Sequence, residues 1–347
     1  MAARTLVPLL ILAACASTSL PAAPARAARH DLPVEIAACV DLPRDDSRSH
    51  NLSGLAWDES AGLLYAISDR DPALTVFRPS DDFHRFPIVD KLLLDVVPGK
   101  WDGEAVTITP GRIYLANEAD PTAIRVTDRE GRRVEGADLP LPAHFRGIRD
   151  NLGLESVAVF AERYLFVANE EALESDGPLA TAEAGTVIRI LRRDLQNGRD
   201  LEVAYRTDPI FADGPEANSG VSDVAPLSPT RLLVLERGYV RGKGNSARIF
   251  RVELDGAEDV VGRAALDGAT ATVPKSLVTD LVDLPDDACS TPPGRERSRV
   301  LENYEGLALG PTRAGKRLLF LISDDNENRT QVGRIVVLSV DDRLLAP

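Results

Sequence analysis

The chain has 347 residues, of which 44% are hydrophobic and 27% charged, and this composition excludes a largely disordered protein. Its formal net charge is −14, from 40 Lys and Arg residues against 54 Asp and Glu residues. An acidic surface repels phosphate backbones, so we expect no nucleic-acid partner. A phosphorylated substrate would need bound cations to reverse the local charge.

The N-terminal segment predicts export from the cytoplasm. Arg4 precedes an apolar run from Leu6 to Ala14, which is too short to span a bilayer as a mature helix. The sequence Leu-Ala-Ala-Cys ending at Cys15 favours a lipobox, with residues 1–14 removed and Cys15 lipidated; ordinary cleavage after Ala27 is the alternative. Either route predicts a periplasmic or lipid-anchored protein, with a lipid anchor as its one membrane contact.

Residues 15–34 are rich in Ala and Pro and predict a flexible tether, followed by one domain over residues 35–347. Two cysteines remain beyond Cys15, namely Cys39 and Cys289. In an oxidising compartment they can form a disulfide, and two buried free thiols are the alternative, because sequence separation does not establish proximity.

Five segments of the domain share one pattern, in which a short strand, a turn with Gly or Pro, and a second strand end in an acidic residue. They begin at Asn51, Asp102, Gly153, Gly220 and Asn303, so the spacing is about 50 residues at first and then 67 and 83. A third strand follows each pair, over residues 74–78, 123–127, 186–191, 248–254 and 334–340. Their alternation of apolar and polar residues is typical of strands.

Repeats of this length predict the blades of a β-propeller. We therefore expect an all-β fold and a single closed β-propeller, with six blades favoured and five or seven as alternatives. The sixth blade would lie around residues 266–284, in the long interval before the last repeat. A strand over residues 35–42 would complete a blade begun at the C-terminus and so close the ring, which removes exposed sheet edges.

Two columns of acidic residues emerge when the repeats are aligned. The first-strand column contains Ser53, Glu104, Glu155, Asp223 and Glu305, and the second-strand column contains Asp69, Glu118, Glu170, Glu236 and Asp324. Because the first strand of each blade lines the channel of a propeller, these columns are expected to meet there. Carboxylates this close repel one another, and a hard cation such as Ca²⁺ removes that cost.

Calcium is accordingly the expected cofactor. Zinc is a poor fit, because the four histidines lack ligand spacing and cysteine is scarce. The candidate ligands are all carboxylates of the two columns together with two residues after Asp324, which are Asp325 and Asn326. Any one of these carboxylates can instead cap a backbone amide or pair with an arginine.

Three stretches carry a family resemblance: NLSGLAWDESAGLLYAISDRD from Asn51, the segment around LLVLERGY, and ENYEGLALGP with LLFLISDDN near the C-terminus. They resemble the bacterial phytase-like domain, also called the esterase-like activity of phytase family, over residues 45–340. The resemblance implies a phosphoesterase-type activity. It carries over to nine residues here: Asp69, Glu104, Glu155, Asp223, Glu236, Glu305, Asp324, Asp325 and Asn326. Ser53 departs from the acidic pattern.

A metal-assisted phosphoesterase is the leading hypothesis, with a small phosphorylated or ester substrate and a monomeric protein. Glu155 or Glu305 would act as the base, and Arg70, Arg237, Arg241 and Lys243 are candidate phosphate contacts. A solvated loop is the alternative explanation for Arg241 and Lys243. Two other functions stay open: a non-catalytic binding propeller with a structural metal, and a metal-dependent lactonase-like ester hydrolase.

Overall fold

The computed structural model describes residues 33–96, 99–149, 151–292 and 294–346, and all that follows refers to these. Residues 1–14 and Cys15, expected as a signal peptide and a lipidation site, lie outside this range, as does nearly all of the expected tether. The compact unit begins at Pro33. None of its described helices is long and apolar enough to cross a membrane.

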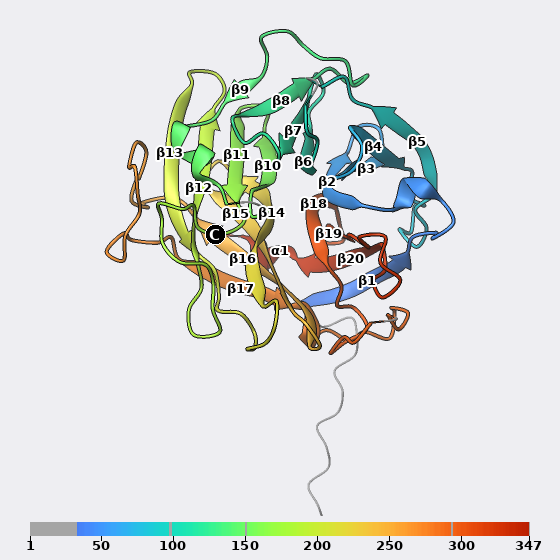
Figure 1. The fold of residues 1–347 in the computed structure, drawn as a ribbon. Coiled ribbons are helices and arrows are strands. Elements are labelled where there is room, and N and C mark those ends of the chain that lie inside the picture. Colours follow the sequence, from blue (N-terminus) through green and yellow to red (C-terminus); the bar gives the residue numbers. More distant parts are fainter. Residues whose placement is uncertain (1–32, 97–98, 150, 293, 347) are drawn as a thin grey trace, which may run out of the picture. The chain divides into compact units, whose positions relative to one another are not determined.

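The described chain folds into five four-stranded antiparallel sheets arranged around one axis (Figure 1). The first four blades follow chain order from the inside outward. They are β2 (Leu52–Asp58), β3 (Leu63–Ser68), β4 (Ala73–Phe77) and β5 (Ile88–Leu93); β6 (Gly103–Ile108), β7 (Ile113–Asn117), β8 (Ala123–Thr127) and β9 (Leu139–Pro140); β10 (Leu154–Phe160), β11 (Tyr164–Asn169), β12 (Val187–Asp194) and β13 (Arg199–Arg206); and β14 (Asn218–Ser228), β15 (Arg231–Val240), β16 (Gly244–Glu253) and β17 (Lys275–Asp280).

The fifth blade joins the two ends of the domain. It consists of β18 (Tyr304–Arg313), β19 (Lys316–Ser323), β20 (Arg334–Asp341) and, on the outside, β1 (Val34–Asp41). In Figure 1 the blue strand β1 lies beside the red strand β20, and their antiparallel pairing runs from Val34 opposite Val340 to Asp41 opposite Arg334. The predicted closure of the ring by the N-terminal strand is confirmed.

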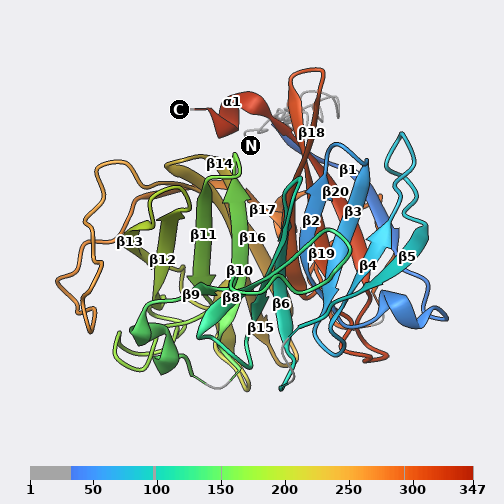
Figure 2. The ribbon, with the colours of Figure 1, turned by 90° about the horizontal axis from the view of Figure 1, so that it is seen from above.

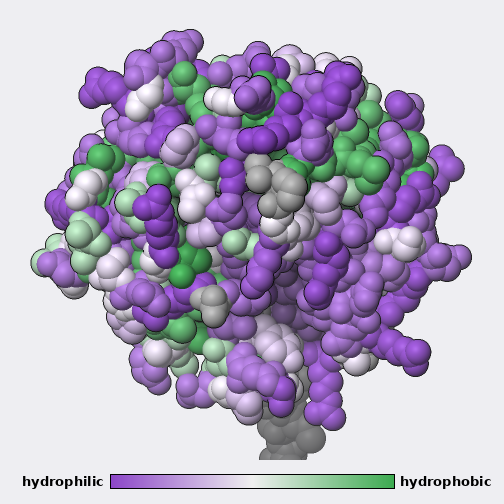
Figure 3. Space-filling model, turned by 45° about the horizontal axis from the view of Figure 1, so that its top comes forward, coloured by the Kyte–Doolittle hydropathy of each residue, from purple (hydrophilic) through white to green (hydrophobic). Residues whose placement is uncertain are grey.

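Apolar side chains pack between neighbouring blades and form the core. Each inner strand contacts the next one around the ring, and β18 contacts β2. Phe320 of β19, for example, is fully buried and packs against Trp57 of β2, with ring centroids 5.4 Å apart. Hydrophilic residues cover most of the face seen in Figure 3, and hydrophobic residues show only in separate patches.

Five blades are present, so the preference for six is wrong. The segment around residues 266–284 contributes the outer strand β17 to the fourth blade instead of a blade of its own. The residues before β17 pack on the outer edge of the third blade, because Val260 and Val273 donate backbone hydrogen bonds to Glu202 and Ala204. Leu266 is buried there as well. The insertion therefore covers the outer edge of the third blade, where unpaired backbone groups could otherwise pair with another chain.

Helical structure is confined to short turns. The described residues contain three 3-10 turns, η2 (Ser47–Ser49), η3 (Ala143–Gly147) and η4 (Leu281–Asp283), and one α-helix, α1 (Asp342–Leu345). Figure 2 shows α1 at the end of the ring where β18 runs into its hairpin, and Asp342 donates a hydrogen bond from its amide to Gly315 in that hairpin. The inner strands therefore begin at the opposite end, where the acidic residues lie.

Cys39 on β1 and Cys289 form a disulfide between positions 250 residues apart in the chain. The bridge fastens the closing strand to the segment that follows β17. A cross-link over a long loop restricts the unfolded chain and so stabilises the folded state.

Removing this disulfide should loosen the closure. We expect the variant C39A/C289A to unfold with a free energy about 2–5 kcal/mol lower than the unaltered protein. Urea denaturation followed by tryptophan fluorescence measures this difference. Reductant should destabilise the unaltered protein and leave the double variant unchanged; equal midpoints for both proteins would contradict a stabilising bridge.

Candidate metal centre at the propeller axis

Each inner strand contains a β-bulge close to its start, and the bulge decides which side chains reach the axis. Pairing with the second strand shifts between Gly103 and Ala105, between Leu154 and Ser156, and between Tyr304 and Gly306. The bulged residue in each case is a glutamate, namely Glu104, Glu155 or Glu305. A bulge re-aims the side chain it carries.

The register defines three equivalent positions in every blade. The first position lies two residues before the bulge, and the second position is the bulged residue. The third position pairs with the first; it directly follows the second strand in four blades and lies within the longer β15 in the fourth. In blade order the first position holds Asn51, Asp102, Gly153, Gly220 and Asn303; the second holds Ser53, Glu104, Glu155, Ser222 and Glu305; and the third holds Asp69, Glu118, Glu170, Arg237 and Asp324.

Third-position side chains lie against the first position of the next blade. Arg237 donates to Oδ1 of Asn303 at 2.8 Å. A Cβ atom at Gly153 would approach the side chain of Glu118 to 2.3 Å, and one at Gly220 would approach that of Glu170 to 2.5 Å. The two glycines are therefore required because the preceding blade places a long glutamate side chain there.

The fourth blade differs from the aligned pattern by one residue in both strands. Its pairing shifts between Val221 and Asp223, so Ser222 is the bulged residue, and Arg237 occupies the third position. Asp223 and Glu236 were aligned with the two acidic columns, and this alignment is wrong. A slip of one residue turns a strand side chain to the opposite face.

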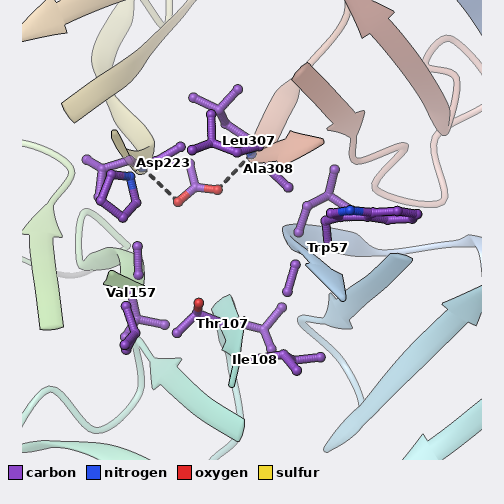
Figure 4. Close-up of a pocket in the computed structure, with 16 residues that line it drawn as sticks. Trp57, Thr107, Ile108, Val157, Asp223, Leu307 and Ala308 are labelled. Atoms are coloured by element: carbon purple, nitrogen blue, oxygen red, sulfur yellow. Dashed lines mark hydrogen bonds between the residues drawn. The ribbon is translucent and has the colours of Figure 1, made fainter. Parts of the chain in front are cut away.

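Asp223 lies deeper in the channel, away from the other carboxylates. Its carboxylate accepts hydrogen bonds from the amides of Val224 at 2.8 Å and Leu307 at 2.7 Å, as Figure 4 shows. The surrounding walls come from all five inner strands and are mostly apolar, with Trp57 and Val157 among them. Asp223 thus ties the fourth blade to the fifth, and we do not include it among the metal ligands.

Glu236 faces away from the axis, toward the outer strand of the third blade. It accepts hydrogen bonds from the hydroxyl of Tyr205 at 2.5 Å, the amide of Asp208 at 2.9 Å and Nζ of Lys275 at 2.6 Å. These donors from the third and fourth blades satisfy the buried carboxylate, so Glu236 too is excluded as a ligand of the axial site.

Eight carboxylates gather around the axis, and we call them the acidic cluster: Asp69, Asp102, Glu104, Glu118, Glu155, Glu170, Glu305 and Asp324. Burial, followed by the charges of Glu305 and Asp102, raises the pKa of Glu104 well above its usual value. Burial and then the charge of Glu305 raise the pKa of Asp324 to about 9. Burial also raises the pKa of Asp69 to about 6.

Arg237 is the cation inside the acidic cluster. Its Nη2 donates to Glu170 at 3.0 Å, and only 16% of its side chain is exposed. Burial raises the pKa of Glu170 to about 7, although the charge of Arg237 opposes that rise. Arg237 and the largely exposed Arg70 are too few positive charges to balance eight carboxylates, so protons or bound cations would stabilise the cluster.

The donor set within the cluster fits a hard divalent cation. Asp102, Glu104 and Glu118 each offer a carboxylate oxygen, and these three oxygens lie within 4.8 Å of one another. Oδ1 of Asp69 is buried without a hydrogen-bond partner among the described residues. Oxygen-only ligands suit Ca²⁺, and they do not suit a metal that prefers nitrogen or sulfur.

The other candidate ligands lie beside the cluster. Asp325 accepts a hydrogen bond from Nδ1 of His50 at 2.6 Å and from two backbone amides, those of Asn51 and Glu327 at 3.3 Å each. Its carboxylate is therefore engaged away from the axis. Asn326 adopts a positive φ of 47° in the turn after β19 and lines the hollow described below.

The predicted phosphate contacts are scattered. Arg70 lies at the edge of the cluster, 3.6 Å from Asp69, and 69% of its side chain is exposed. Arg241 pairs with Glu216 in an exposed loop, and Lys243 donates to the carbonyl oxygen of Asp213 at 2.6 Å. Of the four predicted phosphate contacts, only Arg237 lies inside the cluster. Arg241 and Lys243 lie in exposed loops, as the alternative interpretation of these two residues expects.

Three residues of this centre were missed from the sequence: Asp102, Ser222 and Asn303. A period of two places Asp102 on the same face of its strand as Glu104, and this alternation was a readable signal. Asn303 donates to Glu305 at 2.6 Å and occupies the corresponding place two residues earlier. Ser222 could not be recognised from the sequence, because the neighbouring Asp223 is acidic like the other residues of the first-strand column and was aligned in its place.

A hollow of about 660 Å³ opens beside the acidic cluster, and we call it the mouth hollow. Arg237, Asn303 and Glu305 form its inner wall, and the loops after β15 and β19 form its rim. Glu305 accepts hydrogen bonds from Ser53 at 3.1 Å and Asn303 at 2.6 Å, which hold its carboxylate in place. A small molecule in the hollow would touch the edge of the cluster.

The fold and this centre define a five-bladed propeller with an acidic axial site. A family model described as "Phytase-like: Esterase-like activity of phytase" matches residues 47–327, well over half of the chain. The chain therefore belongs to this family, and the resemblance seen in the sequence is confirmed. No curated protein matches the sequence.

Similar solved structures include several propellers. An endo-arabinase from Bacteroides thetaiotaomicron shares 11% identity and a TM-score of 0.46, with 86% of this chain and 96% of that chain covered. A luciferin-regenerating enzyme shares 11% identity and a TM-score of 0.42, with 87% and 94% covered. A gluconolactonase from Xanthomonas campestris shares 14% identity and a TM-score of 0.37, with 88% and 87% covered. At these identities none of them bears on activity.

Removing the guanidinium of Arg237 should destabilise the metal-free protein. We expect R237M to lower the free energy of unfolding by about 3–5 kcal/mol at pH 8 in chelator, because the carboxylates lose their cation. Urea denaturation provides the measurement. R241M, which removes an exposed arginine from a loop ion pair, is the matched control and should change stability by no more than about 0.5 kcal/mol. Similar losses for the two variants would contradict the role of Arg237.

Stability of the metal-free protein should fall as pH rises. Because the pKa values of Asp69, Glu170 and Asp324 lie at about 6, 7 and 9 in the folded state, the folded protein holds protons that the unfolded chain has lost. Each such group lowers the unfolding free energy by about 1.4 kcal/mol per pH unit between the ordinary carboxyl pKa and its raised pKa in the folded state. Thermal unfolding in chelator from pH 5 to 9 tests this, and a flat profile would refute it.

Proposed function

We propose that this protein is a calcium-dependent ester hydrolase whose substrates are phosphoric esters. The observation that carries the proposal is the convergence of Asp102, Glu104 and Glu118 inside the acidic cluster, next to a hollow of substrate size. Membership of a family described by an esterase-like activity supports hydrolysis. The net charge of −14 makes a bound cation necessary for any anionic substrate.

Asp102, Glu104 and Glu118 would hold the cation, with Asp69 near by on the preceding blade. When bound, the ion would neutralise charge on phosphate oxygens and stabilise the charge that develops in the transition state. Glu118 lies against Gly153 of the third blade, so the same ion would also stiffen the contact between two blades.

Arg237 and Glu305 are placed to act on a substrate in the mouth hollow. Arg237 can donate to a phosphate oxygen while it remains bonded to Glu170 and Asn303. In the reaction a water oxygen bonds to phosphorus as the bond to the alcohol oxygen breaks. Glu305 can accept the proton of that water and return it to the leaving alcohol oxygen, so that alcohol and phosphate are the products.

Glu305 suits this role better than Glu155. Glu305 lines the mouth hollow and is partly exposed, whereas only 6% of Glu155 is exposed. Glu155 lies between Glu104 and Glu170 in the cluster, where burial and these two charges raise its pKa. We assign Glu155 to the electrostatic balance of the cluster.

Export to an oxidising compartment is part of the proposal. The disulfide between Cys39 and Cys289 supports it, because such bonds persist mainly outside the cytoplasm. Lipidation at Cys15 and cleavage after Ala27 remain the two routes by which the N-terminus would be processed.

Calcium binding and turnover should be lost together when the ligands change. We expect D102N and E104Q each to weaken calcium binding at least about tenfold, since each removes a charged ligand. Calorimetry measures the binding, and hydrolysis of p-nitrophenyl phosphate and bis-p-nitrophenyl phosphate measures turnover. E216Q alters an exposed carboxylate in the segment between β13 and β14 and is the matched control.

The outcomes separate the functions under consideration. If the protein binds calcium and hydrolyses no phosphoric ester, the metal has a structural role and the proposed phosphoesterase activity is wrong. Hydrolysis of lactones alone would replace phosphoric esters with carboxylic ones. Full activity in the presence of chelator would contradict the proposed dependence on calcium.

A further inference from the structure

The walls of the mouth hollow are rich in neutral amides. Six asparagines line it, which are Asn151, Asn218, Asn245, Asn303, Asn326 and Asn328. Gln331 and Thr330 add to them at the rim, and Tyr239 supplies the one aromatic ring among the described lining residues. Side-chain amides donate and accept hydrogen bonds without charge. Such a lining suits a ligand with several hydroxyl groups.

Charged groups are few in the same walls. The cations among the described lining residues are Arg237 and Arg295. Arg237 already serves Glu170 and Asn303, at 3.0 and 2.8 Å. Two guanidinium groups match a single phosphoryl group and fall far short of the charge of a polyphosphorylated molecule.

Asn245 is held with an unused acceptor. Its Nδ2 and its backbone amide donate to the two carboxylate oxygens of Glu296, each at 2.8 Å. Only 2% of the residue is exposed, and its Oδ1 has no hydrogen-bond partner among the described residues. The bidentate pairing fixes the amide, so this buried oxygen is ready to accept a hydrogen bond from a ligand.

Arg237 presents an unused donor in the same walls. Its Nε is buried and without a partner among the described residues, while both Nη atoms are bonded. A hydroxyl group both donates and accepts, and it therefore satisfies an orphaned donor and an orphaned acceptor alike. A buried polar group without a partner is costly, so a ligand that supplies one gains affinity.

From this arrangement we propose that the mouth hollow binds a polyhydroxylated, sugar-like group, and that the substrate is a monoester of such a molecule with one phosphoryl group. The proposal rests on the proposed hydrolase function and names its substrate class. The sugar-like group lies among the asparagines, with Asn218 and Asn245 as specificity-determining residues. The single phosphoryl group lies toward Arg237 and the acidic cluster.

The experiment compares esters that share a phosphoryl group and differ in the alcohol. With the full protein in calcium, kcat/KM is measured for glucose 1-phosphate, glucose 6-phosphate, phenyl phosphate and phytate. At least one sugar monophosphate should exceed phenyl phosphate about tenfold, and phytate should fall below both. N218A and N245A should each lower the ratio of sugar ester to phenyl ester about tenfold, the loss of one good hydrogen bond.

Two controls keep the result interpretable. Q196A changes an exposed residue in the turn between β12 and β13, far from the hollow, and should leave the ratio unaltered. Since N245A removes a hydrogen-bond partner of half-buried Glu296, its folding is checked by circular dichroism. If N245A does not fold, N218A, at a half-buried position, decides the matter. Equal kcat/KM values for sugar and phenyl esters, with ratios unmoved in N218A, would overturn the proposal.

Failure of the hydrolase is distinguishable from failure of this inference. If no ester is hydrolysed, binding of free glucose and myo-inositol to the calcium-loaded protein is followed by saturation-transfer NMR. Saturable binding that N218A weakens about tenfold supports the sugar-like group without the chemistry. Absence of binding by both polyols would overturn it.

Discussion

Repulsion between carboxylates at one axis is the constraint on which the rest of the centre depends. A bulge in each inner strand turns a side chain toward the channel, and in three of five blades that side chain is a glutamate. Third-position residues then approach from the neighbouring blade. The same geometry that builds the ring therefore concentrates negative charge in a partly buried place, where it cannot persist without compensation.

The surrounding residues answer this constraint in different ways. Gly153 and Gly220 leave room for long glutamates, Ser53 and Asn303 donate hydrogen bonds to Glu305, and Arg237 brings a positive charge. Asp102, Glu104 and Glu118 bring three carboxylate oxygens within 4.8 Å of one another, and it is there that we propose a cation binds.

Much of this could be predicted from the sequence. The repeated strand pairs established the propeller, its closure by the N-terminal strand and the acidic columns of blades two, three and five, because there the glutamates coincide with the bulge. The fourth blade was misaligned because Asp223 and Glu236 match the chemistry and lie one residue from the register, which only strand pairing reveals. Six blades were preferred because the interval of 83 residues before the last repeat left room for a further blade around residues 266–284. The mouth hollow could not be predicted from the sequence, because its walls come from loops that are far apart along the chain.

Blade four carries Ser222 and Arg237 where blades two, three and five carry a glutamate at the second position and a carboxylate at the third, and this irregularity gives the axis a direction. Five equivalent acidic blades would offer a ligand five indistinguishable ways of docking. With the guanidinium on one side and the three converging carboxylates of blade two on another, the centre is a dipole lying across the pore. A ligand with one anionic group would therefore have a single favoured orientation across the channel.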